Sequence, residues 1–154
     1  MNNLKKDNIN YFTFANNVEI QPLSEVLENS IFIFDDIICE KQNIIKEYFS
    51  MGRHRNIDCF YIGQTYSKIP KTLIRDNTNF LIIFKQDSTN LHHIYKEHVN
   101  SDMSFKSFHK MCNKCWKSKH DFLVIDKEKP LKKGRYKRKF NEYIVIQLST
   151  SEVI

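Results

Sequence analysis

Two adjacent carboxylates, Asp35 and Asp36, end the apolar run from Ile31 to Phe34. Four consecutive apolar residues are typical of a strand buried on both faces, as in a parallel sheet covered by helices. Such strands deliver the residues at their carboxyl ends to the crevice where α/β proteins bind ligands. In a nucleoside triphosphatase the first acid can hold Mg²⁺, usually through water, and the second can orient or deprotonate the attacking water. An alternative stays open, in which Asp35 is a turn residue and Asp36 a helix N-cap.

A helix and a second strand follow the acids. Apolar residues at helical spacing predict a helix over 40–51, and Gly52 directly after it suits a C-terminal cap. The next apolar run predicts a strand over 58–63, and Gln64 follows directly after it. A right-handed crossover would place the two strands side by side and bring Gln64 to the sheet edge that holds the acids. A neutral amide there can hydrogen-bond a terminal phosphate or the attacking water.

The 154 residues are enough for one hydrophobic core, and the alternation of strands and helices predicts an α/β chain with a mainly parallel sheet. We expect residues 1–126 to form the core and residues 127–154 to add a basic loop and a terminal strand to the same domain. The expected strands are 31–35, 58–63, 79–85, 121–125 and one near 142–148; the expected helices are 40–51, 70–76, 89–98, 104–117 and a short one at 24–27 with Ser24 as its N-cap.

The order of these motifs resembles the second half of the poxvirus-type genome-packaging ATPases. These belong to the FtsK–HerA division of P-loop NTPases and also occur in large DNA viruses and virus-like transposons. The resemblance runs from about Leu23 to about Ile144. It is carried by Phe-Ile-Phe-Asp-Asp, Gly-Arg-His-Arg, Ile-Gly-Gln-Thr-Tyr, Ile-Pro, Ile-Arg-Asp-Asn-Thr-Asn, Leu-Ile-Ile-Phe-Lys and a late Phe-Leu-Val-Ile-Asp followed by a basic Tyr-Lys-Arg stretch.

The resemblance implies a set of roles, cofactors and partners. Asp35 and Asp36 match the Walker B pair that serves Mg²⁺ and ATP, and Gln64 matches the polar sensor residue at the end of the next strand. Arg53 and Arg75 are candidates for an arginine finger or an inter-subunit contact. The implied partners are double-stranded DNA and either further copies in a ring or a polypeptide that carries the Walker A loop.

The chain departs from this family at the phosphate-binding loop. That loop needs Gly-x-x-x-x-Gly-Lys followed by Ser or Thr, because glycines let backbone N–H groups wrap the phosphates. The only glycines here are Gly52, Gly63 and Gly134. About 30 residues precede Ser30, too few for the missing strand, loop and helix. We therefore expect the C-terminal half of a motor ATPase, inactive by itself; the alternative is a non-catalytic remnant that binds nucleic acid or assembles with a full-length ATPase.

Positive charge is concentrated near the C-terminus. Residues 127–139 contain eight of the 24 basic residues and one acid, and the rest of the chain has 16 basic and 17 acidic residues. Such a cluster attracts phosphate backbones without regard to sequence, although it can also be a solvated loop with no partner. Pro130 and Gly134 predict a loop or edge strand that projects from the core. The candidate nucleic-acid-binding residues are Lys132, Lys133, Arg135, Lys137 and Arg138.

The residue types of a zinc site occur once, in His109, Cys112, Cys115 and His120. Helical spacing instead places both cysteines on a buried face, so we expect no zinc there and reduced thiols throughout. The three histidines at 92, 93 and 98 are expected on the surface of a helix.

No apolar run reaches the roughly 20 residues of a membrane span, and the N-terminal residues lack the apolar core of a signal peptide. We therefore expect a soluble protein of the host cytoplasm or nucleus, with no membrane partner. Association with a virion is a further possibility that the family resemblance raises.

Overall fold

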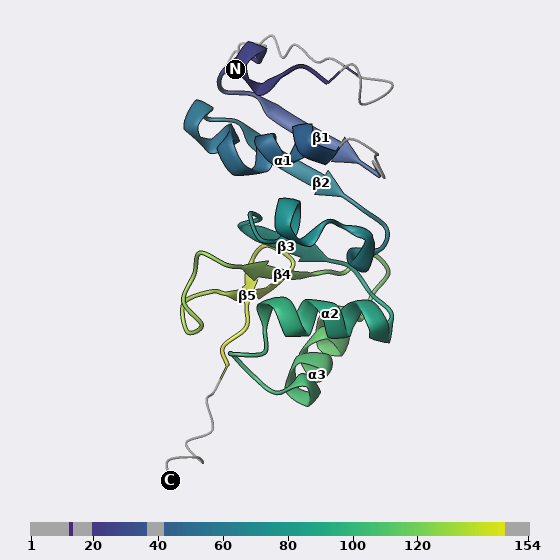
Figure 1. The fold of residues 1–154 in the computed structure, drawn as a ribbon. Helices are drawn as coiled ribbons and strands as arrows, with labels where there is room; N and C mark the ends of the chain where they lie inside the picture. Colours follow the sequence, from purple (N-terminus) through teal and green to yellow (C-terminus); the bar gives the residue numbers. More distant parts are fainter. Residues whose placement is uncertain (1–12, 14–19, 37–41, 147–154) are drawn as a thin grey trace, which may run out of the picture.

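The structure is a computed structural model, and it describes residues 13, 20–36 and 42–146 (Figure 1). Mixed helices and strands form a small parallel sheet and a separate antiparallel sheet. In chain order the elements are η2 (Leu23–Glu25), β1 (Ile31–Asp35), α1 (Gln42–Met51), η3 (Gly52–Arg55), β2 (Asp58–Ile62), η4 (Tyr66–Lys68), the π-helical turn η5 (Lys71–Arg75), β3 (Phe80–Ile83), α2 (Ser88–His98), α3 (Phe105–Cys115), β4 (Leu123–Asp126), β5 (Tyr136–Arg138) and β6 (Glu142–Tyr143).

The parallel sheet consists of β1 and β2, which pair from Ile31 opposite Asp58 to Asp35 opposite Ile62. One face packs on α1, where Phe34 and Tyr48 are almost fully buried and their rings lie 5.6 Å apart. The neighbouring positions on both strands are apolar yet exposed, and no described residue covers them. The expectation that the first strand is buried on both faces is therefore wrong. The exposed side chains are Ile31, Ile33, Phe60 and Ile62.

The second sheet is antiparallel, in the order β3-β4-β5-β6, and α2 and α3 pack on one of its faces. Here the expectation of a mainly parallel sheet is wrong. A single helix between two strands brings the chain back to start a parallel strand. Two successive helices, α2 and α3, connect β3 to β4, so β4 runs in the opposite direction and pairs Phe80 with Asp126.

The two long helices begin at side-chain caps. Asp87 accepts a hydrogen bond from the backbone of Asn90 at 2.9 Å, and Ser104 accepts one from Ser107 at 3.3 Å. These caps satisfy N–H groups that a helix start leaves unpaired. The predicted helices 89–98 and 104–117 are thus confirmed within a few residues. The first short helix differs, because Pro22 precedes a single turn that already contains Ser24.

Figure 1 shows the two sheets stacked along the length of the molecule, with η4 and η5 in the connection between them. The turn η5 packs against α1, and Ile69 contacts the cores of both parts. The chain between β2 and β3 thus links the two sheets through apolar packing. Within the described residues, no helix has the length and apolar character needed to cross a bilayer.

Candidate functional site

The carboxyl ends of β1 and β2 bring the predicted acids and amide together. Asp35 lies opposite Ile62, and the Asp36 N–H donates a 2.8 Å hydrogen bond to the Ile62 carbonyl. Two residues later, the Gln64 side chain donates from Nε2 to Asp36 Oδ2 at 2.9 Å. This contact joins residues 28 positions apart in the sequence, and it confirms the predicted meeting of the two strand ends.

The Asp36 backbone has a φ of 47°, in the left-handed region that few residues other than glycine adopt. Aspartate tolerates this conformation better than most residues, and such conformations gather at functional sites. The backbone bond to Ile62 and the side-chain bond to Gln64 hold Asp36 in this position. Both side chains are exposed, and no described residue bonds to the amide oxygen of Gln64, so this oxygen and the Asp36 carboxylate can meet a ligand or a water.

The carboxylates of Asp35 and Asp36 are the groups that would hold Mg²⁺. Within residues 13, 20–36 and 42–146, no three His, Cys, Asp or Glu side chains are grouped to bind a metal ion. Magnesium in nucleotide sites uses one or two carboxylates and takes its other ligands from waters and phosphates. The pair at the end of β1 fits a metal that arrives with a nucleotide. Residues 37–41, which bear on whether Asp36 is a helix N-cap, lie outside the described part of the chain.

The two candidate arginine fingers differ sharply in environment. Arg75 is buried, and its Nη1 donates to both carboxylate oxygens of Glu97 at 2.8 Å. Its guanidinium also lies 4.8 Å from the ring centre of Tyr66. Arg53 is exposed in η3. That turn lies beside the start of β1, where the Arg55 carbonyl accepts a hydrogen bond from the Asn29 N–H. Arg53 is therefore at the amino ends of the two strands, whereas Asp36 is at their carboxyl ends.

We expect the Arg75→Ala variant to be destabilised by about 3 kcal/mol, because it leaves the partly buried Glu97 carboxylate without its charged partner. The matched variant Arg53→Ala should change the free energy of unfolding by less than about 0.5 kcal/mol, as exposed substitutions usually do. Urea unfolding of both variants measures the difference. Equal stability of the two would show that the Arg75–Glu97 pair does not hold the fold and that Arg75 is free for another role.

The basic segment 127–139 is only in part the loop that the sequence predicts. Residues 127–135 form turns with Lys129, Lys132 and Lys133 exposed, whereas the residues that follow join the sheet instead of projecting from the core. Tyr136 is fully buried, and β5 pairs with β4 on one side and β6 on the other. Arg135, Lys137 and Arg138 flank Tyr136, and the side chain of each pairs with a carboxylate of another element or loop of the fold. The ion pairs are Arg135–Asp102, Lys137–Asp126, Arg138–Asp121, Arg138–Glu142 and Lys139–Asp121.

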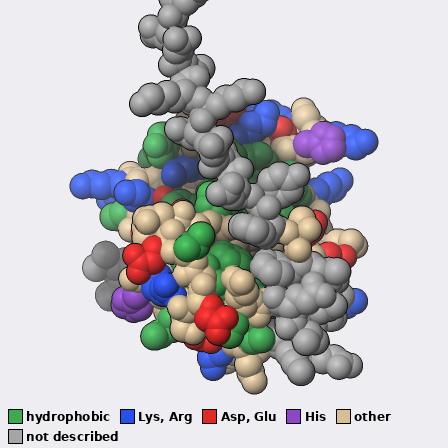
Figure 2. Space-filling view, turned by 90° about the horizontal axis from the view of Figure 1, so that it is seen from above, with side chains coloured by type: hydrophobic (Ala, Val, Ile, Leu, Met, Phe, Trp, Pro, Cys, Tyr) green, Lys and Arg blue, Asp and Glu red, His purple; other side chains and the backbone are tan. Residues whose placement is uncertain are grey.

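Lys132 and Lys133 keep exposed side chains and form no ion pair with a described residue. Lys127 donates from Nζ to the Arg75 and Asp76 carbonyls, each at 3.2 Å. In Figure 2, which views the molecule from the β1 end, Lys and Arg side chains are scattered around the outline with acids between them. The number of basic residues in 127–139 therefore overstates how many positive charges this segment can offer to a partner.

The cysteine prediction is confirmed for the helix, since Cys112 and Cys115 are buried on α3. Burial raises the pKa of Cys115 to about 11, and it raises the pKa of Cys112 further, so both stay protonated thiols. The flanking His109 and His120 are exposed. Cys59, Cys112 and Cys115 are free thiols, and Cys39 lies outside the described residues.

His98 corrects the expectation that all three helix histidines lie on the surface. His92 and His93 are exposed, whereas His98 is 7% exposed. Its Nε2 lies 2.6 Å from the Tyr66 hydroxyl, which also donates to Glu97 at 2.8 Å. Burial, with a smaller contribution from Lys127, lowers the pKa of His98 to about 4. Its place at the end of α2, one turn after buried Ile94, was the sequence signal for burial.

Two carboxylates and an amide at adjoining strand ends, next to a helix-covered parallel pair, make this edge the candidate functional site. Comparison of the chain with protein-family models, with curated proteins and with solved structures found no match. What the site does follows from its residues and their geometry. Asp35, Asp36 and Gln64 come together at the carboxyl ends of β1 and β2, and Arg53 lies at the amino ends of these strands. Arg75 is buried away from both, where it pairs with Glu97 of α2.

Proposed function

We propose that this chain is the Walker B and sensor half of an ATP-driven motor that packages or translocates double-stranded DNA. The observation that carries the proposal is the 2.9 Å hydrogen bond from Gln64 to Asp36, across the carboxyl ends of two parallel strands. Parallel α/β sheets bind their ligands at this edge. The family resemblance implies that the Walker B acids and the sensor amide lie side by side, and the parallel β1–β2 pair supports this arrangement.

Each residue of the site has a distinct task in this proposal. Asp35 would hold Mg²⁺, which supplies neutralisation of the phosphate charge when it is bound with ATP. Asp36 orients the attacking water and accepts its proton. Gln64 holds the Asp36 carboxylate through Nε2 and keeps its amide oxygen available to accept a hydrogen bond from the same water. The amide carries no charge, so it does not compete with the carboxylates for the metal.

The phosphate-binding loop in this proposal comes from polypeptide outside the 154 residues, since these contain no Gly-x-x-x-x-Gly-Lys-Ser/Thr. One face of the β1–β2 sheet is not covered by any described residue, which supports the proposal that a further protein layer packs there. Parallel sheets are normally covered on both faces, yet Ile31 and Ile33 are 65% and 62% exposed. Arg53, at the opposite edge, is the candidate finger for the site of a neighbouring copy in a ring. Arg75 would need to leave its ion pair with Glu97 to serve there.

A second candidate function is DNA binding without hydrolysis. The excess of positive charge, +6 over the whole chain, favours it because phosphate contacts dominate affinity for DNA. The missing phosphate-binding loop also favours it, since two carboxylates alone have nothing to hold a triphosphate. The two candidates differ in one measurable property, which is whether Asp35 and Asp36 bind a divalent metal.

Manganese titration of the isolated chain tests this difference. We expect Mn²⁺ to broaden the backbone amide NMR signals around Asp36 and Gln64, with weak affinity because two carboxylates are only part of a metal site. Asp35→Asn should abolish the broadening. Asp58→Asn is the matched control, because Asp58 is an exposed acid at the opposite edge of the same strand pair. Broadening that is absent, or that survives Asp35→Asn, would exclude the proposed metal site and leave DNA binding without hydrolysis.

A further inference from the structure

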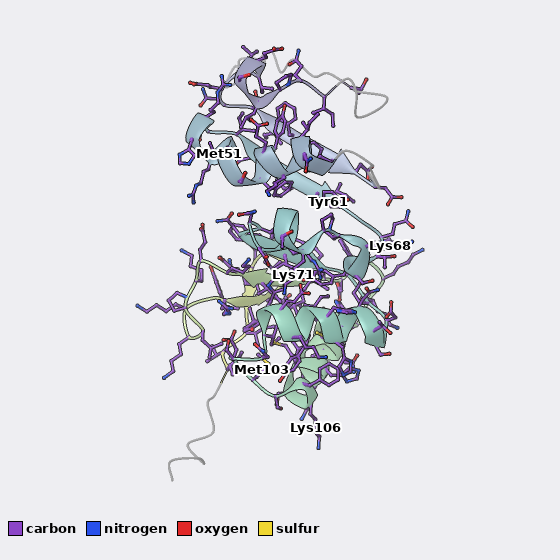
Figure 3. All side chains as sticks on the ribbon, in the orientation of Figure 1. Met51, Tyr61, Lys68, Lys71, Met103 and Lys106 are labelled. Atoms are coloured by element: carbon purple, nitrogen blue, oxygen red, sulfur yellow. The ribbon has the colours of Figure 1, made fainter. Side chains whose placement is uncertain are left out.

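The exposed side of α3 carries a row of lysines. Residues 103–120 contain five lysines and no acid. Lys106, Lys110 and Lys114 follow one another at a spacing of four, which places them within about 80° of one another around the helix. All three side chains are exposed, and Lys106 extends from α3 away from the rest of the molecule (Figure 3). We call these three residues the lysine row.

The charge of the lysine row is not neutralised within the described residues. The acids that flank α3 in the sequence already have partners. Asp102 binds Arg135 at 2.6 Å, and Asp121 binds Arg138 at 2.9 Å. The cations in and next to β5 are thus paired inside the fold, whereas none of the three lysines forms an ion pair with a described residue. Three positive charges on one helix face remain available to a partner.

The lysine row works against the stability of its own helix. Like charges four residues apart repel one another, and both the 106–110 pair and the 110–114 pair are of this kind. Lys106 also lies in the first turn, where the helix dipole favours acids and α3 has none; only Lys114, in the last turn, is favoured by the dipole. A sequence feature that breaks local rules without a compensating contact points to function. A polyanion along the row would convert the repulsion into attraction.

The chemistry of the exposed face identifies the kind of polyanion. The opposite side of α3 is buried through Phe108 and Cys112, so the exposed side has no large apolar residue to enter a membrane. It also lacks an aromatic platform for unstacked bases, because Phe105 already packs on His92, with ring centres 3.9 Å apart. The exposed side thus offers only lysine ammonium groups, spaced about 6 Å apart along a rigid helix. This arrangement suits the regular phosphate backbone of a nucleic acid.

We propose that the lysine row of α3 binds the phosphate backbone of double-stranded DNA without regard to base sequence. Lysine is a point-charge phosphate binder and carries no base readout in this arrangement. The row lies at the end of the molecule remote from β1, so it acts whether or not Asp36 and Gln64 serve a nucleotide (Figure 1). The main DNA contact is thereby α3, and the segment 127–139 is secondary to it.

The test compares two variants of the full chain that lose the same charge. One carries Lys106→Gln, Lys110→Gln and Lys114→Gln. The other removes the three exposed lysines before β5 through Lys129→Gln, Lys132→Gln and Lys133→Gln. The probe is a fluorescent duplex of about 30 base pairs and mixed sequence, titrated in roughly 50–200 mM salt without nucleotide.

We expect the α3 variant to lose affinity by about 10²-fold at 0.1 M salt and its log–log salt slope to fall by about 2.7, at about 0.9 for each phosphate contact. The other variant should keep a slope close to that of the unmodified chain. Equal losses would overturn the proposal by showing a response to net charge alone, and a larger loss in the second variant would move the surface to residues 129–133. No detectable binding by the unmodified chain, or displacement of the duplex by poly-L-glutamate of equal charge, would also overturn it. Matching thermal unfolding of the variants confirms that α3 stays folded.

Discussion

The variant Asp36→Asn should slow ATP hydrolysis by about 10²–10⁴-fold in an enzyme completed with a phosphate-binding loop, and should leave nucleotide affinity nearly unchanged. The amide keeps the shape of the carboxylate and loses the negative charge that accepts a proton from water. It also has to meet the Gln64 amide, which now donates to Asp36 Oδ2. Turnover of Mg–ATP by the reconstituted enzyme, with the loop supplied in the same chain or as a partner, measures the effect.

Three further variants distinguish a reaction site from a structural edge. Asp35→Ala should weaken binding of Mg–nucleotide, because it removes the metal contact. Gln64→Ala should behave like Asp36→Asn, with an equal or smaller loss of turnover, and Asp58→Asn should have no effect from the far edge of the sheet. If the double variant with Asp36→Asn and Gln64→Ala hydrolyses ATP normally, the strand-end contact is structural and the proposed function fails. That outcome would leave the DNA surface on α3 untouched, because DNA binding is measured without nucleotide.

The site was predictable because it depends on local patterns and on one handedness rule. The apolar run before Asp35 and the run before Gln64 each define a strand, and the helical spacing over 40–51 requires a crossover between them. A crossover of this kind makes the strands parallel neighbours. The register then follows, with Asp35 opposite Ile62, and it sets Gln64 within hydrogen-bond distance of Asp36.

The pairing of the remaining strands was less predictable, because it depends on contacts that no local pattern encodes. The run Phe80–Ile83 reads the same in a parallel or an antiparallel sheet. The two helices that follow it decide the direction of β4. In the basic segment, composition indicated charge, but the ion pairs with Asp102, Asp121 and Asp126 depend on acids from 11 to 33 residues away.

The exposed apolar residues of β1 and β2 show a second way in which the sequence did not predict the structure. Together with Phe34 and Tyr61 they form continuous apolar runs, which correctly indicated strands but wrongly indicated burial on both faces. Only one face has a cover among the described residues. The sequence pattern thus favours an apolar cover that the described residues do not supply, which agrees with the proposed need for a partner layer.

Acid should destabilise the protein between about pH 6.5 and pH 4 through His98. Burial lowers the pKa of this imidazole to about 4, against about 6.5 in the unfolded chain. In that interval the unfolded state binds a proton that the folded state excludes, so the free energy of unfolding falls as the pH falls. The full loss is about 3 kcal/mol, at 1.36 kcal/mol for each pH unit between the two pKa values.

The surroundings of His98 explain why the folded protein keeps it neutral. Arg75 and Lys127 oppose a positive charge there, and together with burial they outweigh the attraction of Glu97 at 3.9 Å and of Asp76. The Tyr66 hydroxyl donates its one proton to Glu97, so its oxygen can accept a hydrogen bond from Nε2–H of the neutral imidazole. Arg138 and Lys139 hold the pKa of Asp121 near 2, so the contribution of this carboxylate is lost below about pH 4 and falls outside this interval.

The variant His98→Gln should remove most of this pH dependence, because glutamine retains a hydrogen-bonding group for Tyr66 and does not titrate. Urea unfolding at several pH values between 6.5 and 4 gives the slope, which should be steep in the unmodified protein and flat in the variant. His93→Gln is the matched control, since His93 is exposed on the same helix and should leave the slope unchanged. A slope that persists in His98→Gln, or an NMR titration of His98 near pH 6.5, would show that the Tyr66–His98 contact does not exclude the proton and that acid acts on the fold elsewhere.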